Sequence, residues 1–127
     1  MIKKTYNLLN QTILGPKWLL NHRMKSFFHI ISNDINNKGF SILDIGCNDG
    51  WYWDKYFKNE NITGLDISPP LKSKKSIIKG DAQKLPFKDK TFDVIFLFFM
   101  LDDILHPLKA LDEVKRVLKP AGKIYLF

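Results

Sequence analysis

The chain has 127 residues, of which 45% are hydrophobic and 26% are charged, and its formal net charge is +7 at pH 7. This length and composition are those of one globular domain with a hydrophobic core. The single cysteine excludes an intramolecular disulfide and a cysteine metal cluster. A chain without disulfides is typical of the reducing cytoplasm.

Charge and hydropathy narrow the partners that we expect. The longest apolar run, residues 94–101, is much shorter than the ~20 residues of a membrane helix, and no apolar signal core follows Lys3 and Lys4. We therefore expect a soluble, cytoplasmic protein without a membrane span. The charge of +7 would suit an anionic partner such as RNA, but no basic cluster alternates with aromatic residues, so nucleic acid is not favoured.

The first part of the chain is expected to be helical. Residues 3–14 are a first candidate helix, which Gly15 and Pro16 would end. From Lys17 to about Asn36, apolar residues recur three and four positions apart, as on one face of an amphipathic helix. We assign residues 1–38 to an N-terminal helical segment and residues 39–127 to a following domain.

That domain opens with a strand, a glycine turn and a helix. Residues 42–45 form an apolar run typical of a strand buried on both faces, interrupted by Asp44. A carboxylate there requires a polar partner at the carboxyl end of the strand. Gly46 and Gly50 bracket a tight turn, and the aromatic segment 51–58 is the expected first crossover helix, with its N–H groups toward a ligand.

Further strands follow, two of them with an acidic end. Segments 62–66 and 77–81 end in Asp66 and Asp81, and residues 92–98 read as a buried central strand. The connection 67–76 holds two prolines and is short for a crossover, so no helix longer than one or two turns is expected there.

The last elements are a helix and a strand. Residues 107–118 predict a helix with an apolar face, and residues 119–122 would end it before a fifth strand over 123–127. The residues that are expected to share the apolar face of the helix are Leu108, Leu111, Val114, Val117 and Leu118.

Taken in order, these segments resemble the class I S-adenosylmethionine-dependent methyltransferases, and among them the group that acts on small molecules and quinones. The matching segments are residues 42–50, 64–68, 80–87, 92–95 and 111–122. The resemblance implies a Rossmann-like, doubly wound α/β fold with a mostly parallel sheet ordered 3-2-1-4-5, N-terminal helices packed on the sheet, and the family's strands 6 and 7 missing. The middle glycine of the family's turn is Asn48 here, a residue that tolerates positive φ.

The resemblance also implies S-adenosyl-L-methionine as the cofactor and no metal. Asp44 would hold the methionine ammonium, Asp66 the ribose and Asp81 the adenine amino group, while the glycine turn allows close backbone approach. In full, the implied cofactor-binding residues are Asp44, Gly46, Cys47, Asn48, Gly50, Asp66, Ile67, Asp81, Ala82 and Phe98.

The acceptor side is less defined, and no catalytic residue is assigned. Asp102, Asp103 and His106 form a titratable cluster that either supplies a general base or caps a turn. The fourth strand is not followed by an Asn-Pro-Pro-aromatic segment, and no Pro-Cys pair exists, which disfavours adenine amine and cytosine C5 acceptors. The expected function is methyl transfer to a small-molecule acceptor.

Two alternatives remain open. One is a non-catalytic methyltransferase-like protein that binds cofactor and a protein partner through an open sheet edge; a weaker one is a nicotinamide-binding oxidoreductase, whose G-x-G-x-x-G turn is lacking. The fifth strand would be an apolar, unpaired edge, which favours association. We expect either that the chain is a truncated form or that something else covers this edge. We therefore expect the chain to bind cofactor, to transfer methyl groups poorly alone, and to tend to self-associate.

Overall fold

The computed structural model describes residues 17–57, 61–73, 75–98 and 100–127, and it divides into two compact units between Asp34 and Ile35. In the first unit, α2 spans Lys17–Ile35, as the apolar spacing predicts. The chain then turns at Asn37, which adopts a φ of +62°. The candidate helix over residues 3–14 lies outside the described residues, and the packing of α2 on the sheet stays a prediction.

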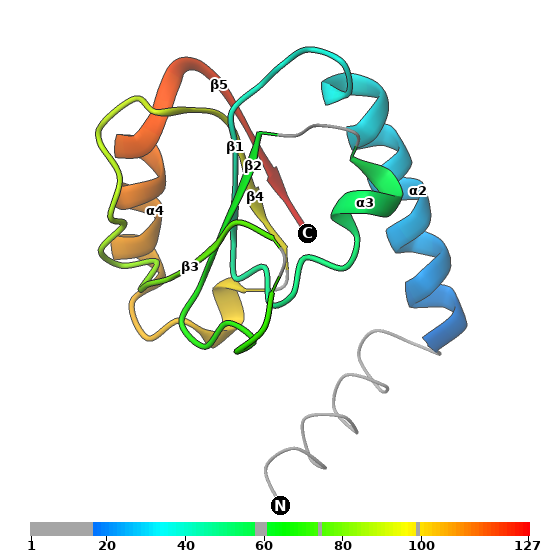
Figure 1. The fold of residues 1–127 in the computed structure, drawn as a ribbon, viewed down its shortest axis with the longest axis horizontal. Coiled ribbons are helices and arrows are strands. Elements are labelled where there is room, and N and C mark those ends of the chain that lie inside the picture. The colour runs from blue at the N-terminus through cyan, green and yellow to red at the C-terminus, as the bar shows by residue number, and fades with distance from the viewer. Residues whose placement is uncertain (1–16, 58–60, 74, 99) are drawn as a thin grey trace, which may run out of the picture. The chain divides into compact units, whose positions relative to one another are not determined.

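The second unit contains a parallel sheet of five strands in the order β3-β2-β1-β4-β5, the predicted doubly wound topology (Figure 1). Each neighbouring pair of strands is parallel. The central strand β1 is buried at all four positions, as expected for a strand covered on both faces. The bounds of the strands are β1 (Ile42–Ile45), β2 (Ile62–Asp66), β3 (Ile77–Lys79), β4 (Phe92–Leu97) and β5 (Leu118–Leu126).

The register places the carboxyl ends of the inner strands beside one another. Ile45, the last residue of β1, pairs with Leu65 of β2 and with Leu97 of β4. Asp66, the last residue of β2, pairs with Lys79 of β3. The loops that leave these four strands therefore meet along one edge of the sheet, where ligands bind in open α/β folds.

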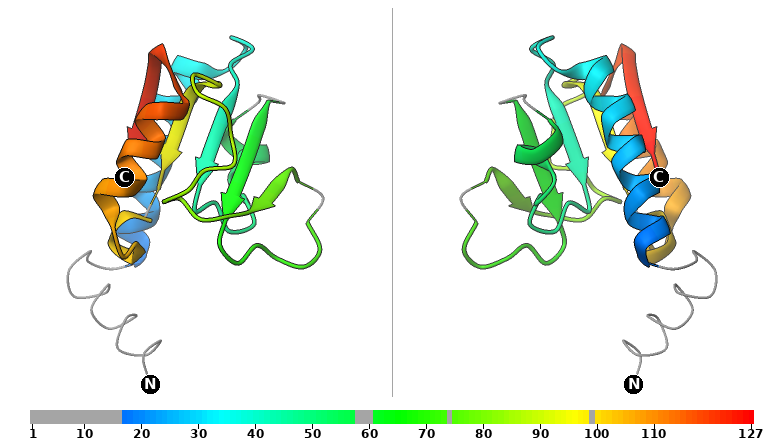
Figure 2. Two further views of the ribbon diagram at one scale, coloured as in Figure 1. Left: turned by 90° about the vertical axis from the view of Figure 1, so that its left-hand side faces the viewer. Right: turned by 90° about the vertical axis from the view of Figure 1, so that its right-hand side faces the viewer.

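Helices α3 (Trp53–Tyr56) and α4 (Pro107–Val117) lie on opposite faces of the sheet (Figure 2). The prediction of a crossover helix over 51–58 is wrong at both ends, because α3 begins only at Trp53 and ends at Tyr56, after which Phe57 is already extended. The Asp49 carboxylate accepts the backbone N–H of Trp51 at 3.1 Å, and the Gly50 carbonyl accepts that of Trp53 at 3.0 Å. These bonds hold residues 51 and 52 in a turn, a local alternative to helix that Asp side chains offer.

The buried stripe of α4 differs from the predicted one. Ala110, Val114 and Val117 are buried, whereas Leu108 is 76% exposed and Leu111 is also exposed. Because an α-helix has about 3.6 residues per turn, residues spaced three apart rotate steadily around it, and Leu108 ends up opposite Val117. The core on this face consists of Leu43, Ile45, Leu65, Leu85, Phe92, Ile95, Leu97, Met100, Val114 and Val117.

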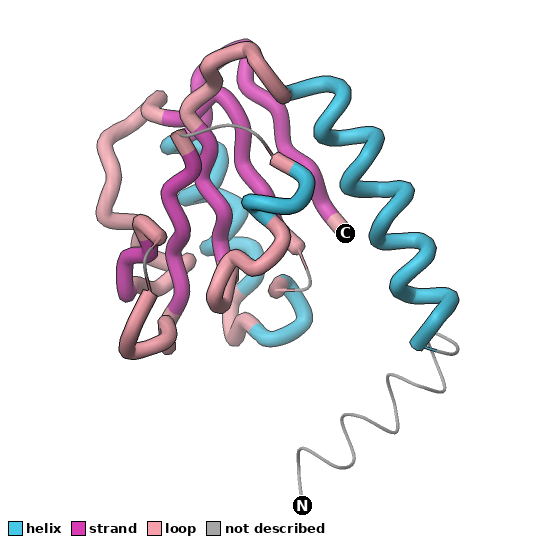
Figure 3. Tube along the Cα trace, turned by 45° about the vertical axis from the view of Figure 1, so that its right-hand side comes forward, coloured by secondary structure: helices cyan, strands magenta, loops and turns pink. Residues whose placement is uncertain are grey.

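Two connections bear on the earlier expectations. The described residues of 67–76 contain no helix, as predicted, and form a loop between β2 and β3 (Figure 3). The fifth strand was expected over 123–127, but β5 begins at Leu118, directly after α4. An irregularity separates the pair Phe92–Leu118 from the pair Val94–Lys123, so residues 119–122 bulge opposite Asp93, whose carboxylate contacts Lys119 Nζ at 2.8 Å.

Strand β5 forms an outer edge of the sheet that the structure describes, with Ile124 and Leu126 exposed. A partner or self-association at this edge stays a prediction. Within the described residues, no helix has the length and apolar character to cross a membrane.

Candidate functional site

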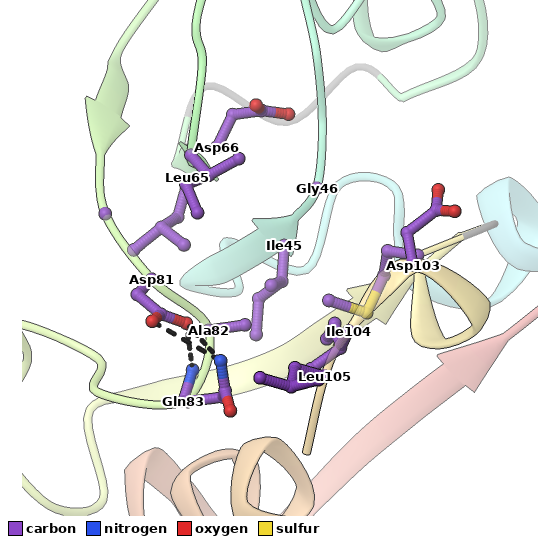
Figure 4. A pocket seen from close by; sticks show the side chains of 13 residues that line it. Ile45, Gly46, Leu65, Asp66, Asp81, Ala82, Gln83, Asp103, Ile104 and Leu105 are labelled. Carbon is purple, nitrogen blue, oxygen red and sulfur yellow. Dashed lines mark hydrogen bonds between the residues drawn. The ribbon is translucent and has the colours of Figure 1, made fainter. Parts of the chain in front are cut away.

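A cavity of about 370 Å³ lies at the carboxyl ends of the strands (Figure 4). Its walls come from the last residues of β1 and β2 and from the loops that follow β1, β2, β3 and β4. The lining residues are Ile45, Gly46, Leu65, Asp66, Ile67, Gly80, Asp81, Ala82, Gln83, Met100, Asp103, Ile104 and Leu105. The cavity thus brings together Gly46, Asp66, Ile67, Asp81 and Ala82 from the predicted set, while Asp44, Cys47, Asn48, Gly50 and Phe98 are not among its lining residues.

Asp66 ends β2 and links two of the loops at the cavity. Its Oδ2 accepts the backbone N–H of Asn48 at 2.8 Å, and its Oδ1 accepts that of Ser68 at 2.9 Å. Each carboxylate oxygen has two lone pairs, so both oxygens retain capacity for a ligand hydroxyl. The side chain predicted to contact the ribose therefore also fixes the glycine turn.

Asp81 follows β3 and is held by its own loop. Its Oδ1 accepts the backbone N–H of Gln83 at 2.8 Å, and the side-chain Nε2 of Gln83 lies 3.2 Å from the same oxygen (dashed in Figure 4). This Asx-type turn orients the carboxylate at the wall of the cavity. Gln83 itself also lines the cavity.

The glycine turn permits a close approach of two loops. Gly46 has a φ of +73°, and a Cβ at this residue would lie 2.7 Å from Met100 Cβ. A side chain there would push the loop after β4 away from the end of β1. Asn48 adopts a φ of +51°, so the residue in place of the family's middle glycine has the positive φ that asparagine tolerates.

Asp44 lies below the turn and is completely buried. Its Oδ2 accepts hydrogen bonds from Tyr52 Oη at 2.6 Å and from Trp53 Nε1 at 2.5 Å. Its Oδ1 is buried and has no hydrogen-bond partner among the described residues. Burial raises the pKa of Asp44 to about 7, an effect that the two donors only partly oppose. A buried carboxylate oxygen left without a donor is costly, so this atom has capacity for a further donor.

Two aromatic residues beside Asp44 have a polar role that the sequence analysis did not predict. Tyr52 immediately precedes α3 and Trp53 is its first residue; they follow Asp44 by eight and nine positions. Aromatic side chains that carry an O–H or N–H, placed this soon after a buried carboxylate, are the signal that would have found them. Phe98, the residue after β4, stacks on Phe96 with ring centroids 4.8 Å apart and also contacts Tyr52, so it supports this group.

Cys47 belongs to the glycine turn, and its side chain is buried. Its Sγ lies 3.6 Å from the Asn48 carbonyl, and burial raises the pKa of the thiol to about 12. A thiol in such surroundings is inert as a nucleophile.

The acceptor side of the cavity is formed by the loop after β4 and by the short 3-10 helix η1 (Leu101–Asp103). Met100, Ile104 and Leu105 give this wall an apolar character. Of the three titratable candidates only Asp103 lines the cavity, across from Asp66 and Asp81 in Figure 4. Asp102 and His106 are exposed. The apolar residues of this loop were not assigned a role in the site, because nothing in their spacing distinguishes the wall of a cavity from a core.

Comparison with known proteins gives the relatives of this chain. It is 31% identical to the ubiquinone/menaquinone biosynthesis C-methyltransferase of Paraburkholderia phymatum, an alignment that covers 97% of the chain and 55% of the relative. It is 30% identical to the tRNA U34 carboxymethyltransferase of Nautilia profundicola, with 93% and 42% covered. It is also 40% identical to an uncharacterized protein of Methanocaldococcus jannaschii, with 70% and 40% covered.

Solved structures share the fold. A protein from Pyrococcus horikoshii OT3 superposes with a TM-score of 0.71 at 25% identity, over 97% of this chain and 64% of the other. An S-adenosylmethionine-dependent methyltransferase from Aquifex aeolicus gives a TM-score of 0.61 at 24% identity, over 76% and 60%. The chain spans about 40–55% of the length of the three curated relatives described above.

The sequence match extends over most of the second unit. Residues 43–126 match the methyltransferase domain family, a range that includes all of the sheet except Ile42 and every residue that lines the cavity. S-adenosylmethionine is the cofactor that these comparisons support. The chain belongs to the methyltransferase domain family.

Proposed function

We propose that the chain binds S-adenosylmethionine in the cavity at the ends of β1 to β4 and serves methyl transfer to a small-molecule acceptor. One observation carries the proposal: the described lining residues include three carboxylates, Asp66, Asp81 and Asp103, and no lysine or arginine. Such a wall favours a cationic, hydroxyl-rich ligand over a phosphorylated one.

Individual residues that line the cavity also fit the cofactor. Asp66 ends β2 and Asp81 follows the neighbouring strand β3, and their carboxylates can accept hydrogen bonds from ribose hydroxyls and from an adenine amino group. Ile45, Leu65 and Ile67 provide apolar surface for a planar base between them. The turn from Gly46 to Gly50 lacks the G-x-G-x-x-G spacing of dinucleotide-binding folds, which disfavours the nicotinamide alternative.

Asp44 is proposed to hold the ammonium of the methionine part. The support is its buried Oδ1, which has no hydrogen-bond partner among the described residues, while Oδ2 is already fixed by Tyr52 and Trp53. A cationic donor would satisfy this oxygen and stabilise the charged carboxylate. The glycine turn between Gly46 and Gly50 gives the ligand access to backbone groups.

The bound cofactor supplies an activated methyl group on a sulfonium. The chain's own residues orient the two reactants and exclude water, for which Met100, Ile104 and Leu105 form an apolar wall beside Gly46. Asp103 is the candidate general base for an acceptor that must lose a proton, because it is the titratable member of its cluster that lines the cavity.

A small-molecule acceptor is favoured by the apolar wall and by the character of several relatives. Two of them are a ubiquinone/menaquinone biosynthesis C-methyltransferase and, at 31% identity over 78% of the chain, a sterol 4-C-methyltransferase of Caenorhabditis elegans. The tRNA U34 carboxymethyltransferases among the relatives make tRNA the competing acceptor.

The test has two stages. Calorimetry with S-adenosylmethionine, S-adenosylhomocysteine and NAD is expected to show saturable binding of the first two and no binding of NAD. Transfer of labelled methyl groups is then measured with a quinone, a sterol and unfractionated tRNA as acceptors. Binding of NAD in place of S-adenosylmethionine would refute the cofactor, whereas label in tRNA alone would refute the small-molecule acceptor.

A protein partner at the open edge is a second proposal. Ile124 and Leu126 of β5 are 45% and 57% exposed, and apolar edge strands pair readily with other chains. Among the structural neighbours, a putative methyltransferase of Haloferax volcanii was solved in complex with its Trm112 activator. Sizing of the purified chain, alone and after Leu126→Lys, tests whether this edge drives association.

A further inference from the structure

Lys75 lies on the helix-free connection between β2 and β3, and its side chain reaches the glycine turn and α3. Its Nζ donates a hydrogen bond to the carbonyl of Gly50. The same ammonium lies 5.4 Å from the centroid of the Trp53 ring and 3.2 Å from Asp54 Oδ2. The side chain is only 21% exposed, so most of the long stem is withdrawn from water.

The backbone around Lys75 is anchored on β2. Gly64 N donates to the Ser76 carbonyl at 2.8 Å, and Ile77 N donates to the Lys75 carbonyl at 2.9 Å. The lysine therefore projects from a fixed base and has little freedom to follow movements of α3. An ammonium has three donors, and its contacts here combine a carbonyl, a carboxylate and an aromatic face.

Two of these contacts, those to Gly50 and to the Trp53 ring, fix the start of α3, whose first residue contacts Asp44. Gly50 O accepts both Lys75 Nζ and the backbone N–H of Trp53, so the lysine holds the turn from which α3 begins. A cation over an indole face is attracted by the negative charge of the ring and increases the polarity of the ring N–H. That N–H, Trp53 Nε1, donates to Asp44 Oδ2 at 2.5 Å.

We propose that Lys75 is a positioning residue for cofactor binding, which acts through Trp53 to orient Asp44 and leave its Oδ1 ready for the ligand. This inference rests on the proposed cofactor site and deepens it. Asp54 contributes little, because its side chain is 85% exposed and an exposed ion pair is weak. The contacts that matter are therefore those to the ring and to the Gly50 carbonyl.

The direction in which the affinity for S-adenosylmethionine changes when Lys75 is replaced distinguishes a positioning role from a simple effect of charge. S-adenosylmethionine carries a net positive charge, so removal of a nearby lysine should by charge alone strengthen its binding. Loss of the positioning contacts should weaken it. The matched control is Lys72→Met, which removes the same charge from an exposed position on the same connection.

Calorimetry with S-adenosylmethionine on the full chain decides between these readings. Lys75→Met should weaken binding by about five- to tenfold, Lys75→Arg should restore most of it, and Lys72→Met and Asp54→Asn should bind like the parent. In a Trp53→Phe background, which keeps a ring but removes the N–H, Lys75→Met should have little further effect, because contacting residues are not additive. Affinity of Lys75→Met equal to or above that of Lys72→Met overturns the proposal.

A second readout does not depend on the cofactor. In ¹⁵N-labelled protein without ligand, the indole N–H resonance that disappears in Trp53→Phe should move in Lys75→Met and return toward its place in Lys75→Arg. If the parent chain fails to bind S-adenosylmethionine, the proposed function fails, and this resonance still decides whether Lys75 acts on Trp53. An unchanged resonance in folded Lys75→Met, or in folded Lys75→Gln, overturns the coupling.

Discussion

The backbone N–H of Asn48 donates a 2.8 Å hydrogen bond to Asp66 Oδ2, which joins the turn after β1 to the end of β2. One carboxylate thus shapes the turn and faces the cavity. The two tasks are separable by experiment, because only one of them requires a ligand.

Asp66→Ala is expected to weaken S-adenosylmethionine binding by roughly 1–3 kcal/mol, because ribose hydroxyls lose a charged acceptor. The free energy of unfolding without ligand should fall by less, at most about 1 kcal/mol, since the freed N–H of exposed Asn48 can bond to water. Calorimetry and urea denaturation measure the two quantities. Parent-like affinity in this variant would exclude Asp66 from the cofactor site.

Asp44 should make the stability of the ligand-free chain depend on pH. Its pKa is about 7 in the folded chain and close to 4 when unfolded, so the folded state holds more protons between these values. The free energy of unfolding from this group is therefore highest below pH 4 and falls, by about 1 kcal/mol per pH unit, as the pH rises toward 7. Urea denaturation between pH 4.5 and 7.5, parent against Asp44→Asn, should show a difference that changes with pH; parallel curves would contradict the assignment.

The thiol of Cys47 should be protected in the folded chain. It is the only cysteine in the sequence, it is buried, and burial raises its pKa to about 12, so the reactive thiolate is scarce at neutral pH. Reaction with a colorimetric disulfide reagent should be slow in native buffer and rapid in urea. Fast stoichiometric labelling of native protein would show that the turn opens readily.

Arg116 connects the end of α4 to residues 85–89 of the loop between β3 and β4. Its guanidinium donates to the carbonyls of Leu85 and Phe87 and to the carboxylates of Asp89 and Glu113. Arg116→Lys cannot reproduce this fork of donors and is expected to lower the melting temperature by several degrees. Lys115→Met, a change at the exposed neighbouring position, is the control and should leave it unchanged. Equal melting temperatures for the two variants would show that the Arg116 contacts do not stabilise the fold.

The buried face of α4 can be tested with two truncations. Val114→Ala should cost about 2 kcal/mol of stability because it opens a cavity in the core, whereas Leu108→Ala should cost less than about 0.5 kcal/mol. Thermal or urea denaturation measures both. The reverse ranking would support the apolar face that residue spacing alone predicts.

The strands and their order were predictable because the inner strands are short and largely apolar, and because β2 ends in Asp66. The start of α3 was not predictable from its aromatic residues, because an Asp49 side chain competes for the backbone N–H of Trp51. Such competition depends on the turn geometry, which residue type alone does not specify.

The candidate site was predictable where it depends on strand ends and not where it depends on contacts between distant loops. Asp66 and Asp81 follow strands and lie at the cavity, whereas Met100 reaches it only because the loop after β4 lies against Gly46. Lys75 has no sequence signal, since its partners at Gly50 and Trp53 belong to another connection. The boundary between residues 38 and 39 and the roles of the site residues stay predictions.

The parallel sheet has a kinetic consequence for the cofactor. Every strand pair joins segments linked by a crossover, and β1 pairs with β4 across the full stretch from Ile42 to Val94, so the chain must close long loops before any pair gains its contacts. The walls of the cavity come from four such segments and exist together only after those closures. A ligand that recognises only the finished cavity cannot guide the chain toward it. S-adenosylmethionine should therefore slow unfolding while leaving the rate of refolding unchanged.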